Sequence, residues 1–247
     1  FAIQRDIDKM IVIFKFEEDF YQRSGIKVSY VGHPLIDAIQ HLIPKEKICG
    51  RLQLDENKLT LGLLPGSRVK EIERHMPLLL KTAAYLKAKY PMMQFVLIKA
   101  PTIERRLLDN YLKDISLSVA VAECDQYSVI NACHLCVVAS GTATLETAIL
   151  EKPMVVIYKT SFFTWLLAKL FVKIPDIGLV NVVAQKRIVP ECVQFQATPK
   201  NIAAELEKIF TDETRIAEIK MELKNMRRQL DQGGASERAA GEILKII

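Results

Sequence analysis

Short apolar runs alternate with longer stretches of helical periodicity along most of the chain. The apolar runs predict strands at Met10–Phe14, Val28–Val31, Leu59–Leu64, Phe95–Ile98, Ser118–Val121, Leu135–Ala139 and Met154–Tyr158. Most of these runs are continuously apolar, as expected for strands that are covered on both faces. Helical patterns lie between them at Glu71–Lys89, Ile103–Lys113 and Thr142–Leu150. This alternation predicts an α/β fold with a Rossmann-like parallel sheet.

Changes in the pattern divide the chain into three regions. Residues 1–43 hold strand-like pieces, residues 44–199 predict one Rossmann-like unit, and residues 200–247 are helical and charged. The charged segment Pro44–Lys58 leads into the central unit, and Gly233-Gly234 separates two helices of the tail. The chain opens Phe-Ala-Ile, without an initiator Met or a signal-peptide pattern, so we expect it to begin within a larger protein.

Composition excludes several classes of protein. Half of the 247 residues are hydrophobic, which excludes intrinsic disorder, and Gly and Pro are scattered without period, which excludes collagen. The net charge of +5 is diffuse; it suits acidic small ligands or an anionic membrane surface and predicts no nucleic-acid partner. Five cysteines, an odd number in a core-forming chain, favour a reducing compartment over a disulfide framework.

The first candidate site is the turn Leu64-Pro65-Gly66-Ser67-Arg68, between a predicted strand and a long helix. Gly66 permits a tight turn, and Ser67 is expected to cap the helix. The first amides of a helix and its dipole favour an anion, and Arg68 adds a guanidinium that fits phosphate oxygens. An ordinary turn with a solvated arginine would have the same sequence.

A second turn of this kind follows the predicted strand Leu135–Ala139 and includes Ser140, Gly141 and Thr142. Glu146 comes one turn into the following helix, where its carboxylate either accepts hydrogen bonds from ribose hydroxyls or only favours the helix N-terminus. Two polar, glycine-containing turns at the carboxyl ends of strands in one sheet are where α/β proteins bind nucleotides. Together the turns predict a nucleotide-phosphate site.

Other motifs point away from common cofactors. The sequence has neither Gly-x-Gly-x-x-Gly after a strand nor the P-loop pattern, so it indicates neither an NAD-dependent oxidoreductase nor a P-loop ATPase. Cys133 and Cys136 have Cys-x-x-Cys spacing, but they run into an apolar strand and are expected to be buried cysteines rather than metal ligands. His33, in the turn Val31-Gly32-His33-Pro34, either faces a cleft or caps the next helix.

Two further features each leave two interpretations open. Ser161–Ile174 is the most apolar stretch and holds the only Trp; it is too short and too charged to span a bilayer, and either lies in a membrane interface or packs on the sheet. Asn181, Glu191 and Gln194 lie in or beside apolar runs. Their side chains either contact a base or sugar, or satisfy backbone groups of a loop.

The motifs VGHPLID, LLPGSR, ASGTATLE, KPMVVIYK and VPECVQ occur in this order. This series resembles the lipid-A-disaccharide synthases, a family of bacterial glycosyltransferases with GT-B architecture, over nearly the whole chain. Lys15 and Val180 stand where the family usually has proline. The resemblance implies that residues 1–43 are a remnant of the amino-terminal acceptor domain and the crossover, 44–199 the UDP-sugar-binding domain, and 200–247 the carboxyl-terminal helices. The domain that carries the general base would then be mostly missing, which leaves catalysis by this chain alone open.

The activity that the resemblance implies is an inverting hexosyl transfer in lipid A biosynthesis. Diacylglucosamine would pass from UDP to diacylglucosamine 1-phosphate, giving the β-1,6 disaccharide and UDP without a metal or other cofactor. Arg68 would stabilise the transition state. The residues implied to bind the nucleotide sugar are Gly66, Ser67, Arg68, Ser140, Gly141, Thr142, Glu146, Asn181, Glu191 and Gln194.

The resemblance also implies partners and a location. The protein would be cytoplasmic and peripheral, on the cytoplasmic face of the inner membrane, and would form a homodimer with Asn181, Glu191 and Gln194 near a subunit boundary. Two alternatives are another UDP-sugar enzyme of GT-B fold, either an epimerase or a transferase, and a non-catalytic nucleotide-binding fragment. Dependence of activity on detergent or lipid would separate an enzyme for acylated sugars from the first alternative.

Overall fold

The computed structural model describes residues 2–123, 125–161, 165, 176–230 and 233–246. Its contacts group the chain into two compact units, one formed by residues 1–41 with 224–247 and the other by residues 42–223. The helices after residue 199 are therefore shared between the two units. Helix α12, Glu213–Gln229, contains the division. Each unit is described by itself below.

The larger unit holds a six-stranded sheet in the order β5-β4-β3-β6-β7-β8, and every neighbouring pair is parallel. The strands are β3 Thr60–Leu64, β4 Gln94–Ile98, β5 Ala120–Ala122, β6 Leu135–Ala139, β7 Met154–Tyr158 and β8 Glu191–Val193. The predicted α/β fold with a Rossmann-like parallel sheet is confirmed. In the register of β3 and β6, Leu64 pairs with Val138, so the two candidate turns follow neighbouring strands.

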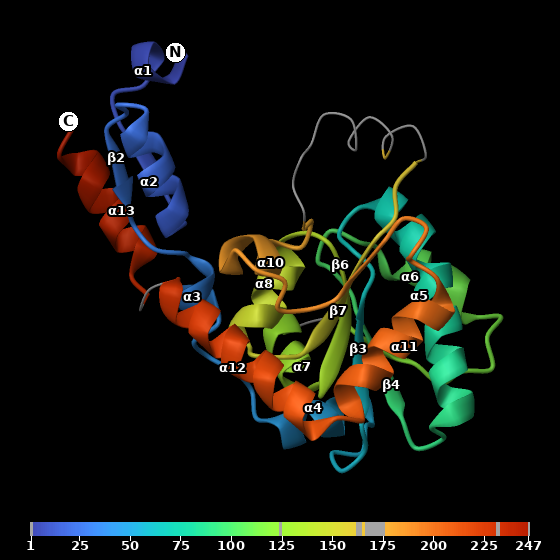
Figure 1. Cartoon of the computed structure of the whole chain (residues 1–247). Helices are drawn as coiled ribbons and strands as arrows, with labels where there is room; N and C mark the ends of the chain where they lie inside the picture. Colours follow the sequence, from blue (N-terminus) through green and yellow to red (C-terminus); the bar gives the residue numbers. More distant parts are fainter. Residues whose placement is uncertain (1, 124, 162–164, 166–175, 231–232, 247) are drawn as a thin grey trace. The chain divides into compact units, whose positions relative to one another are not determined.

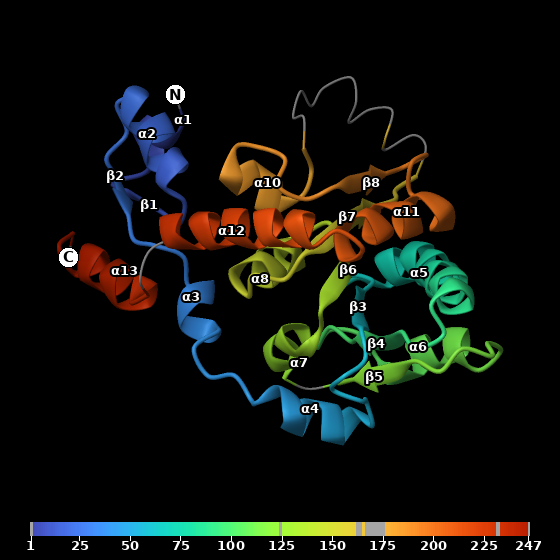
Figure 2. The ribbon, with the colours of Figure 1, turned by 60° about the horizontal axis from the view of Figure 1, so that its bottom comes forward.

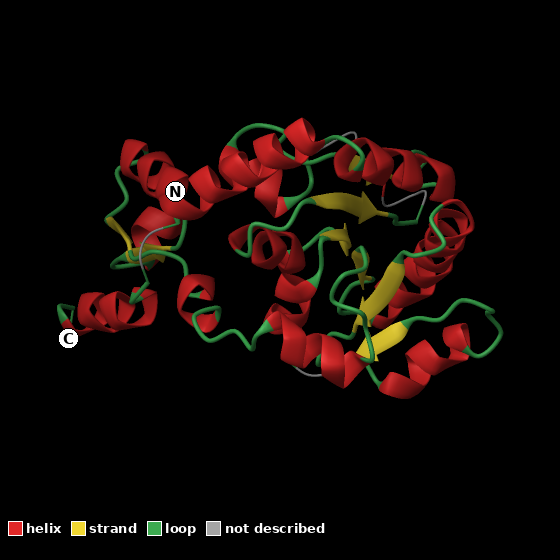
Figure 3. Ribbon diagram, turned by 90° about the horizontal axis from the view of Figure 1, so that it is seen from below, coloured by secondary structure: helices red, strands yellow, loops and turns green. Residues whose placement is uncertain are grey.

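Helices cover both faces of this sheet, which is why its strands are continuously apolar. One set, on the same side in Figures 1 and 2, consists of α5 Val69–Lys89, α6 Arg105–Leu112 and α11 Pro199–Phe210. The other set consists of α4 Lys45–Leu52, α7 Gln126–Ala132, α8 Thr142–Ile149 and α10 Leu179–Ala184. Figure 3 shows the strands enclosed between the helices. Core side chains such as Leu61, Leu63, Val137 and Val155 are fully buried.

Helix α5 follows directly from the first candidate turn. Its residues Ile72, Met76, Leu79, Ala83 and Leu86 are buried. They recur every three or four positions, the spacing of one face of a helix. This apolar stripe seats the helix on the core of the larger unit.

Cys133 and Cys136 are buried, as the apolar run predicts. A Cβ atom at Gly62 would lie 2.9 Å from the Cys136 Sγ and 3.0 Å from the Cys133 Sγ. Only a glycine on β3 leaves room for both thiols beside β6. The hydrogen bond with Cys136, followed by burial, raises the pKa of the Cys133 thiol well above its ordinary value. Both cysteines therefore act as core residues.

The smaller unit joins the two ends of the described chain. Its elements are α1 Ala2–Asp6, β1 Met10–Val12, α2 Lys15–Arg23, β2 Val28–Tyr30, α3 Leu35–Ala38 and α13 Ala235–Leu244, with β1 and β2 parallel. The Asp37 carboxylate accepts hydrogen bonds from the N–H groups of Gly234 (2.7 Å) and Ala235 (3.2 Å) at the start of α13. Near the other end of α13, Glu242 accepts a hydrogen bond from Ser29 (3.0 Å) and pairs with Lys9.

His33 caps a helix, one of the two roles that the sequence leaves open. Its side chain is 6% exposed and its ring lies 5.0 Å from that of Phe14. The N–H of Leu35, which opens α3, donates to His33 Nδ1 at 3.2 Å. Burial lowers the pKa of His33, which favours the neutral ring that such an acceptor requires.

The apolar stretch Ser161–Ile174 lies outside the described residues, apart from Ser161 and Trp165. Within the part of the chain that the structure describes, no helix has the length and apolar character needed to cross a membrane.

Candidate functional site

A cavity of about 440 Å³ lies at the carboxyl ends of β3, β4 and β6. Both candidate turns line it. Of the ten residues predicted to bind a nucleotide sugar, it brings together Gly66, Ser67, Arg68, Ser140, Gly141, Thr142 and Glu146. Asn181, Glu191 and Gln194 are not among the residues that line it.

The first turn folds around the side chain of Glu71. The Ser67 N–H donates to Glu71 Oε2 at 3.0 Å, and Arg68 Nη1 donates to Glu71 Oε1 at 3.0 Å. Gly66 has a φ of +117°, and a Cβ atom there would lie 2.8 Å from the Glu71 Cβ and still closer to Oε2. The carboxylate therefore holds both the backbone of the turn and the Arg68 guanidinium in place at the edge of the cavity. Glu71 was not predicted as a site residue; its signals in the sequence are its position in the first turn of α5 and its place three residues after the LLPGSR motif.

The prediction that Ser67 caps α5 is wrong. The N-cap residue is Arg68, with φ −123° and ψ 144°, and no side chain caps the helix there. The carboxylate of Glu71 reaches back from within the helix and accepts a hydrogen bond from the Ser67 N–H, which precedes the N-cap. The Ser67 carbonyl in turn accepts a hydrogen bond from Thr102 Oγ1 at 2.7 Å, which ties the turn to the loop after β4.

Arg68 is available to a ligand. Its side chain is 81% exposed, while that of Glu71 is 18% exposed. Ion pairs with an exposed partner contribute only about 0–1 kcal/mol to stability. A ligand that carries two phosphate charges can therefore draw the guanidinium toward the cavity at small cost.

The second turn presents the start of α8 to the cavity. The Ser140 N–H donates to the Ile157 carbonyl (2.8 Å) and its hydroxyl donates to the Ile177 carbonyl (2.7 Å), so Ser140 fastens the turn. Thr142 and Ala143 open the helix and line the cavity. Their backbone N–H groups have no acceptor among the described residues. They are thus free to bind an anion, and the helix dipole favours one there.

Glu146 lies further along α8, in the wall of the cavity. Its carboxylate is half-buried and accepts a hydrogen bond from Gln126 Nε2 at 3.5 Å. Burial raises the pKa of Glu146, and a hydrogen bond with Tyr127 opposes that rise. A carboxylate held among neutral donors can accept hydrogen bonds from sugar hydroxyls.

Asn181 satisfies a loop, the second of the two interpretations that its sequence position leaves open. Its side chain is 1% exposed. Oδ1 accepts from the N–H groups of Ile188 (2.8 Å) and Val189 (3.1 Å), and Nδ2 donates to the Val189 carbonyl (2.9 Å) and to Glu191 Oε1 (2.8 Å). These four hydrogen bonds use the full capacity of the amide.

Glu191 and Gln194 bind backbone in the same way. Glu191 accepts hydrogen bonds from the N–H groups of Ile177 (2.9 Å) and Gly178 (3.0 Å). Gln194 pairs with both backbone groups of Thr160, accepting from its N–H at 3.1 Å and donating to its carbonyl at 3.2 Å. In this structure the two side chains hold loops rather than the wall of the cavity.

Replacing Asn181 is expected to test this structural role. Asn181→Ala should lower the free energy of unfolding by about 2–4 kcal/mol, because the buried N–H groups of Ile188 and Val189 lose their acceptor. Urea denaturation would measure the change. Asn201→Ala is the matched control, since Asn201 is exposed and its side-chain amide donates to one carbonyl, that of Gln196, among the described residues. Similar losses for the two variants would contradict the role given to Asn181.

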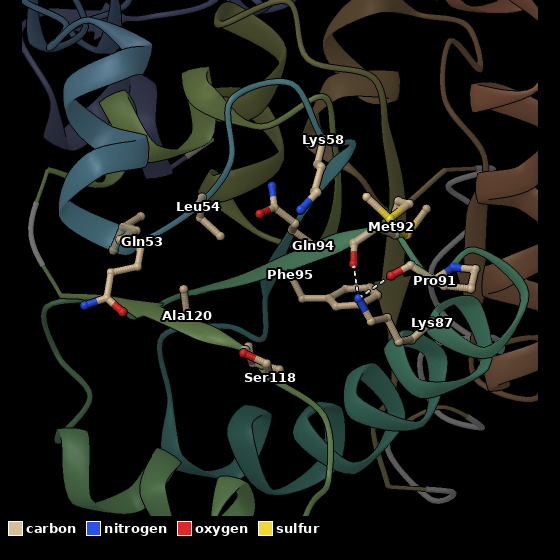
Figure 4. Close-up of a pocket in the computed structure, with 13 residues that line it drawn as sticks. Gln53, Leu54, Lys58, Lys87, Pro91, Met92, Gln94, Phe95, Ser118 and Ala120 are labelled. Carbon is tan, nitrogen blue, oxygen red and sulfur yellow. Dashed lines mark hydrogen bonds between the residues drawn. The ribbon is translucent and has the colours of Figure 1, made fainter.

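A second cavity, of about 420 Å³, opens at the amino ends of β4 and β5, the opposite edge of the sheet (Figure 4). Two of its polar side chains, those of Lys87 and Gln94, are engaged with the backbone of the protein. The Lys87 ammonium donates to the carbonyls of Pro91 (2.6 Å) and Met93 (2.9 Å), and the Gln94 amide bonds the backbone of Asp55. The free helix amides and the exposed guanidinium instead lie at the carboxyl edge, which is therefore the candidate site.

Comparison with known proteins places the chain in a family. The family model for lipid-A-disaccharide synthetase matches residues 1–247. The chain is 37% identical over 245 residues to the lipid-A-disaccharide synthase of Geobacter metallireducens, which covers 99% of this chain and 64% of that protein. It is 39% identical over 242 residues to the same enzyme of Syntrophus aciditrophicus, covering 98% and 63%. The chain thus spans less than two thirds of the length of these curated relatives.

Solved structures share the fold at low identity. The UDP-GlcNAc 2-epimerase from Neisseria meningitidis, bound to UDP-GlcNAc, has a TM-score of 0.64 at 17% identity and covers 95% of this chain and 61% of that chain. CalG4, the calicheamicin glycosyltransferase, has a TM-score of 0.58 at 16% identity, with coverages of 95% and 51%. These neighbours have the GT-B fold, so the predicted fold class is confirmed.

The two kinds of comparison answer different questions. The structural neighbours include epimerases and transferases, so at these identities they show the fold alone. The family model and the curated relatives match the chain from end to end, and they confirm the resemblance that the motifs carry. The chain belongs to the lipid-A-disaccharide synthetase family.

Proposed function

We propose that this chain provides the donor-binding part of a lipid-A-disaccharide synthase. The proposed reaction moves diacylglucosamine from its UDP-activated form to diacylglucosamine 1-phosphate, and it yields the β-1,6 disaccharide and UDP. The observation that carries the proposal is the convergence of Arg68, the Ser67 turn and the start of α8 on one cavity, in a chain that matches this family over its whole length.

The groups around the cavity suit a nucleoside diphosphate sugar. The N–H groups of Thr142 and Ala143 and the Arg68 guanidinium are donors for diphosphate oxygens, because helix amides and arginine both favour phosphate. Glu146 is an acceptor for the hydroxyls of the ribose. The glycosyl carbon would then lie above the carboxyl edge of the sheet, where α/β proteins hold their ligands.

The proposed mechanism is a single displacement that inverts the anomeric carbon. The acceptor hydroxyl oxygen attacks that carbon, its proton passes to a general base, and the bond to the diphosphate oxygen breaks with its electron pair leaving on UDP. Negative charge grows on the diphosphate as this bond breaks, so donors placed beforehand lower the barrier. Arg68 is the residue we assign to this task. The resemblance assigns the base to the amino-terminal domain of the family.

We extend the proposal to the membrane and to assembly. Both substrates carry acyl chains, so a peripheral position on the cytoplasmic face of the inner membrane would bring the protein to them. An exposed aromatic side chain supports this part: Phe195 is 66% exposed, and its ring contacts that of Trp165 at 5.1 Å. A homodimer belongs to the proposal on the family resemblance alone.

Titration with UDP tests donor binding directly. We expect saturable binding of UDP to the 247-residue chain, and binding about 10- to 100-fold weaker for Glu146→Ala, which loses a charged hydrogen-bond acceptor. Glu205→Ala is the matched control, because this carboxylate lies on α11 and pairs with Lys208 at the surface. Calorimetry would measure the affinity for UDP of the wild-type chain and of both variants. A folded wild-type chain that does not bind millimolar UDP would overturn the proposed donor site.

A further inference from the structure

His75 connects two loops that flank the candidate site. It lies on α5 and is fully buried, with 0% exposure. Its Nδ1 is 2.8 Å from the carbonyl oxygen of Pro65, the residue before Gly66. Its Nε2 accepts a hydrogen bond from the N–H of Lys159, directly after β7, at 3.1 Å. Neither the sequence motifs nor the proposed chemistry uses this residue.

The two partners dictate the protonation state of the ring. A carbonyl oxygen can only accept, so Nδ1 must carry a proton; a backbone N–H can only donate, so Nε2 must be bare. The ring is therefore the neutral Nδ1–H tautomer. A second proton would sit on Nε2 and face the Lys159 N–H, and the hydrogen bond to β7 would be lost.

The position of His75 in the sheet gives this link its consequence. Strand β6 lies between β3 and β7, so the imidazole joins the ends of the two strands on either side of the second turn. That turn is itself tied to β7, because the Ser140 N–H donates to the Ile157 carbonyl. The ring therefore connects the first turn, through Pro65, with the end of β7, the strand to which the second turn is bonded.

We propose that His75 is a positioning residue, which in its neutral form sets the separation of the two anion-binding turns and so the affinity for a nucleoside diphosphate. This inference rests on the proposed function for the identity of the ligand. The role of the ring as a link between Pro65 and Lys159 does not depend on that identity.

The link is expected to fail in acid. Burial lowers the pKa of His75 below its ordinary 6.5; the Pro65 carbonyl and Glu71 favour the charged form, while Arg74 and Lys159 disfavour it. The ring of Tyr158 is the other neighbour, at 6.4 Å. Because the folded pKa is the lower one, the stabilisation from neutral His75 is complete above pH 6.5 and is lost as the pH falls toward the folded value.

Two variants of the whole chain separate positioning from packing. His75→Phe fills the space without either hydrogen bond, and should bind UDP about tenfold more weakly at neutral pH. The side chain of His75→Gln does not titrate, and its amide can still make one of the two hydrogen bonds. Its affinity for UDP should therefore stay within about threefold of wild type. UDP itself changes charge in this pH range, and that change affects its binding to every variant equally. The loss of UDP affinity in acid that is due to His75 is therefore the difference between the losses of wild type and His75→Gln.

Leu79→Ala is the control for stability, since Leu79 is fully buried one turn further along the same helix. It should lower the denaturation midpoint at least as far as His75→Phe while leaving the affinity for UDP nearly unchanged. Equal losses of affinity in these two variants would overturn the positioning role. So would an acid loss in His75→Gln as large as that of wild type.

Amide hydrogen exchange in the absence of ligand tests the link between Pro65 and Lys159 independently of UDP. His75→Phe should speed exchange at Lys159 and Ser67 and leave exchange within β4 unchanged. If wild type bound no UDP but these amides still responded, the donor site would fail and the link between the turns would stand. Unchanged exchange at Lys159 would overturn the link itself.

Discussion

Arg68→Ala is expected to lower kcat/KM about 30- to 1000-fold in a full-length enzyme of this family that carries the present residues. The guanidinium is the only permanent cation that lines the cavity among the described residues, so its loss leaves the charge on the departing UDP without its strongest partner. Losing one group that stabilises such a charge costs about 2–4 kcal/mol of barrier. Steady-state kinetics with the acylated substrates would measure the change. Arg68→Lys should recover only part of it, because an ammonium lacks the planar fork.

A matched variant exists on another helix. Arg215 pairs with Glu218 three residues later, as Arg68 pairs with Glu71. Arg215→Ala should leave kcat/KM unchanged, and both variants should keep the free energy of unfolding within about 0.5 kcal/mol of wild type, since exposed pairs contribute little. An unchanged kcat/KM in Arg68→Ala would remove Arg68 from the mechanism.

Gly66→Ala is expected to weaken UDP binding about 10- to 100-fold and to lower the free energy of unfolding by about 1–3 kcal/mol. The backbone at Gly66 has a φ of +117°, which side chains rarely allow, and the new Cβ would overlap Glu71. Either the turn or the carboxylate must move, and both set the position of Arg68, whose guanidinium Glu71 holds. Calorimetry with UDP and urea denaturation would measure the two effects.

Gly50→Ala provides the contrast. Gly50 lies inside α4, and a Cβ atom there would have nothing within 4 Å. It should gain about 0.5–1 kcal/mol of stability, because alanine favours a helix more than glycine does, and it should bind UDP like wild type. If Gly66→Ala also bound UDP like wild type, the turn would not be the anion site.

The strands were the most predictable part of the fold. Strands β6 and β7 lie at the predicted Leu135–Ala139 and Met154–Tyr158. They were predictable because a strand that is buried on both faces has an unbroken run of apolar residues. Strand β8, Glu191–Val193, was not predicted: it has three residues and begins with a carboxylate that binds the Ile177–Gly178 backbone. This segment is a strand because it pairs with β7, and such pairing between distant segments cannot be read from the local sequence.

The site was partly predictable for a similar reason. The two turns carry glycine and hydroxyl residues where strands end, and parallel pairing brings such ends together. Glu71 and His75 were not predicted as site residues because each acts on backbone groups: Glu71 on the turn four residues before it, and His75 on Pro65 and on the distant Lys159. Glu71 resembles an ordinary helix-start carboxylate, and His75 an ordinary core residue, until the turn at Gly66 is seen in three dimensions.

The way the smaller unit closes has a consequence for biosynthesis. Lys9 and Glu242, which pair within it, are 233 residues apart in the chain. Residues 42–223 form one continuous stretch and can fold while the ribosome is still extending the chain. The strands β1 and β2 precede this stretch in the chain, but they lack α13 until Gly234 and Ala235, which bind Asp37, have been made. These strands are therefore synthesised before residues 42–223, yet they complete their native contacts after that stretch is able to fold.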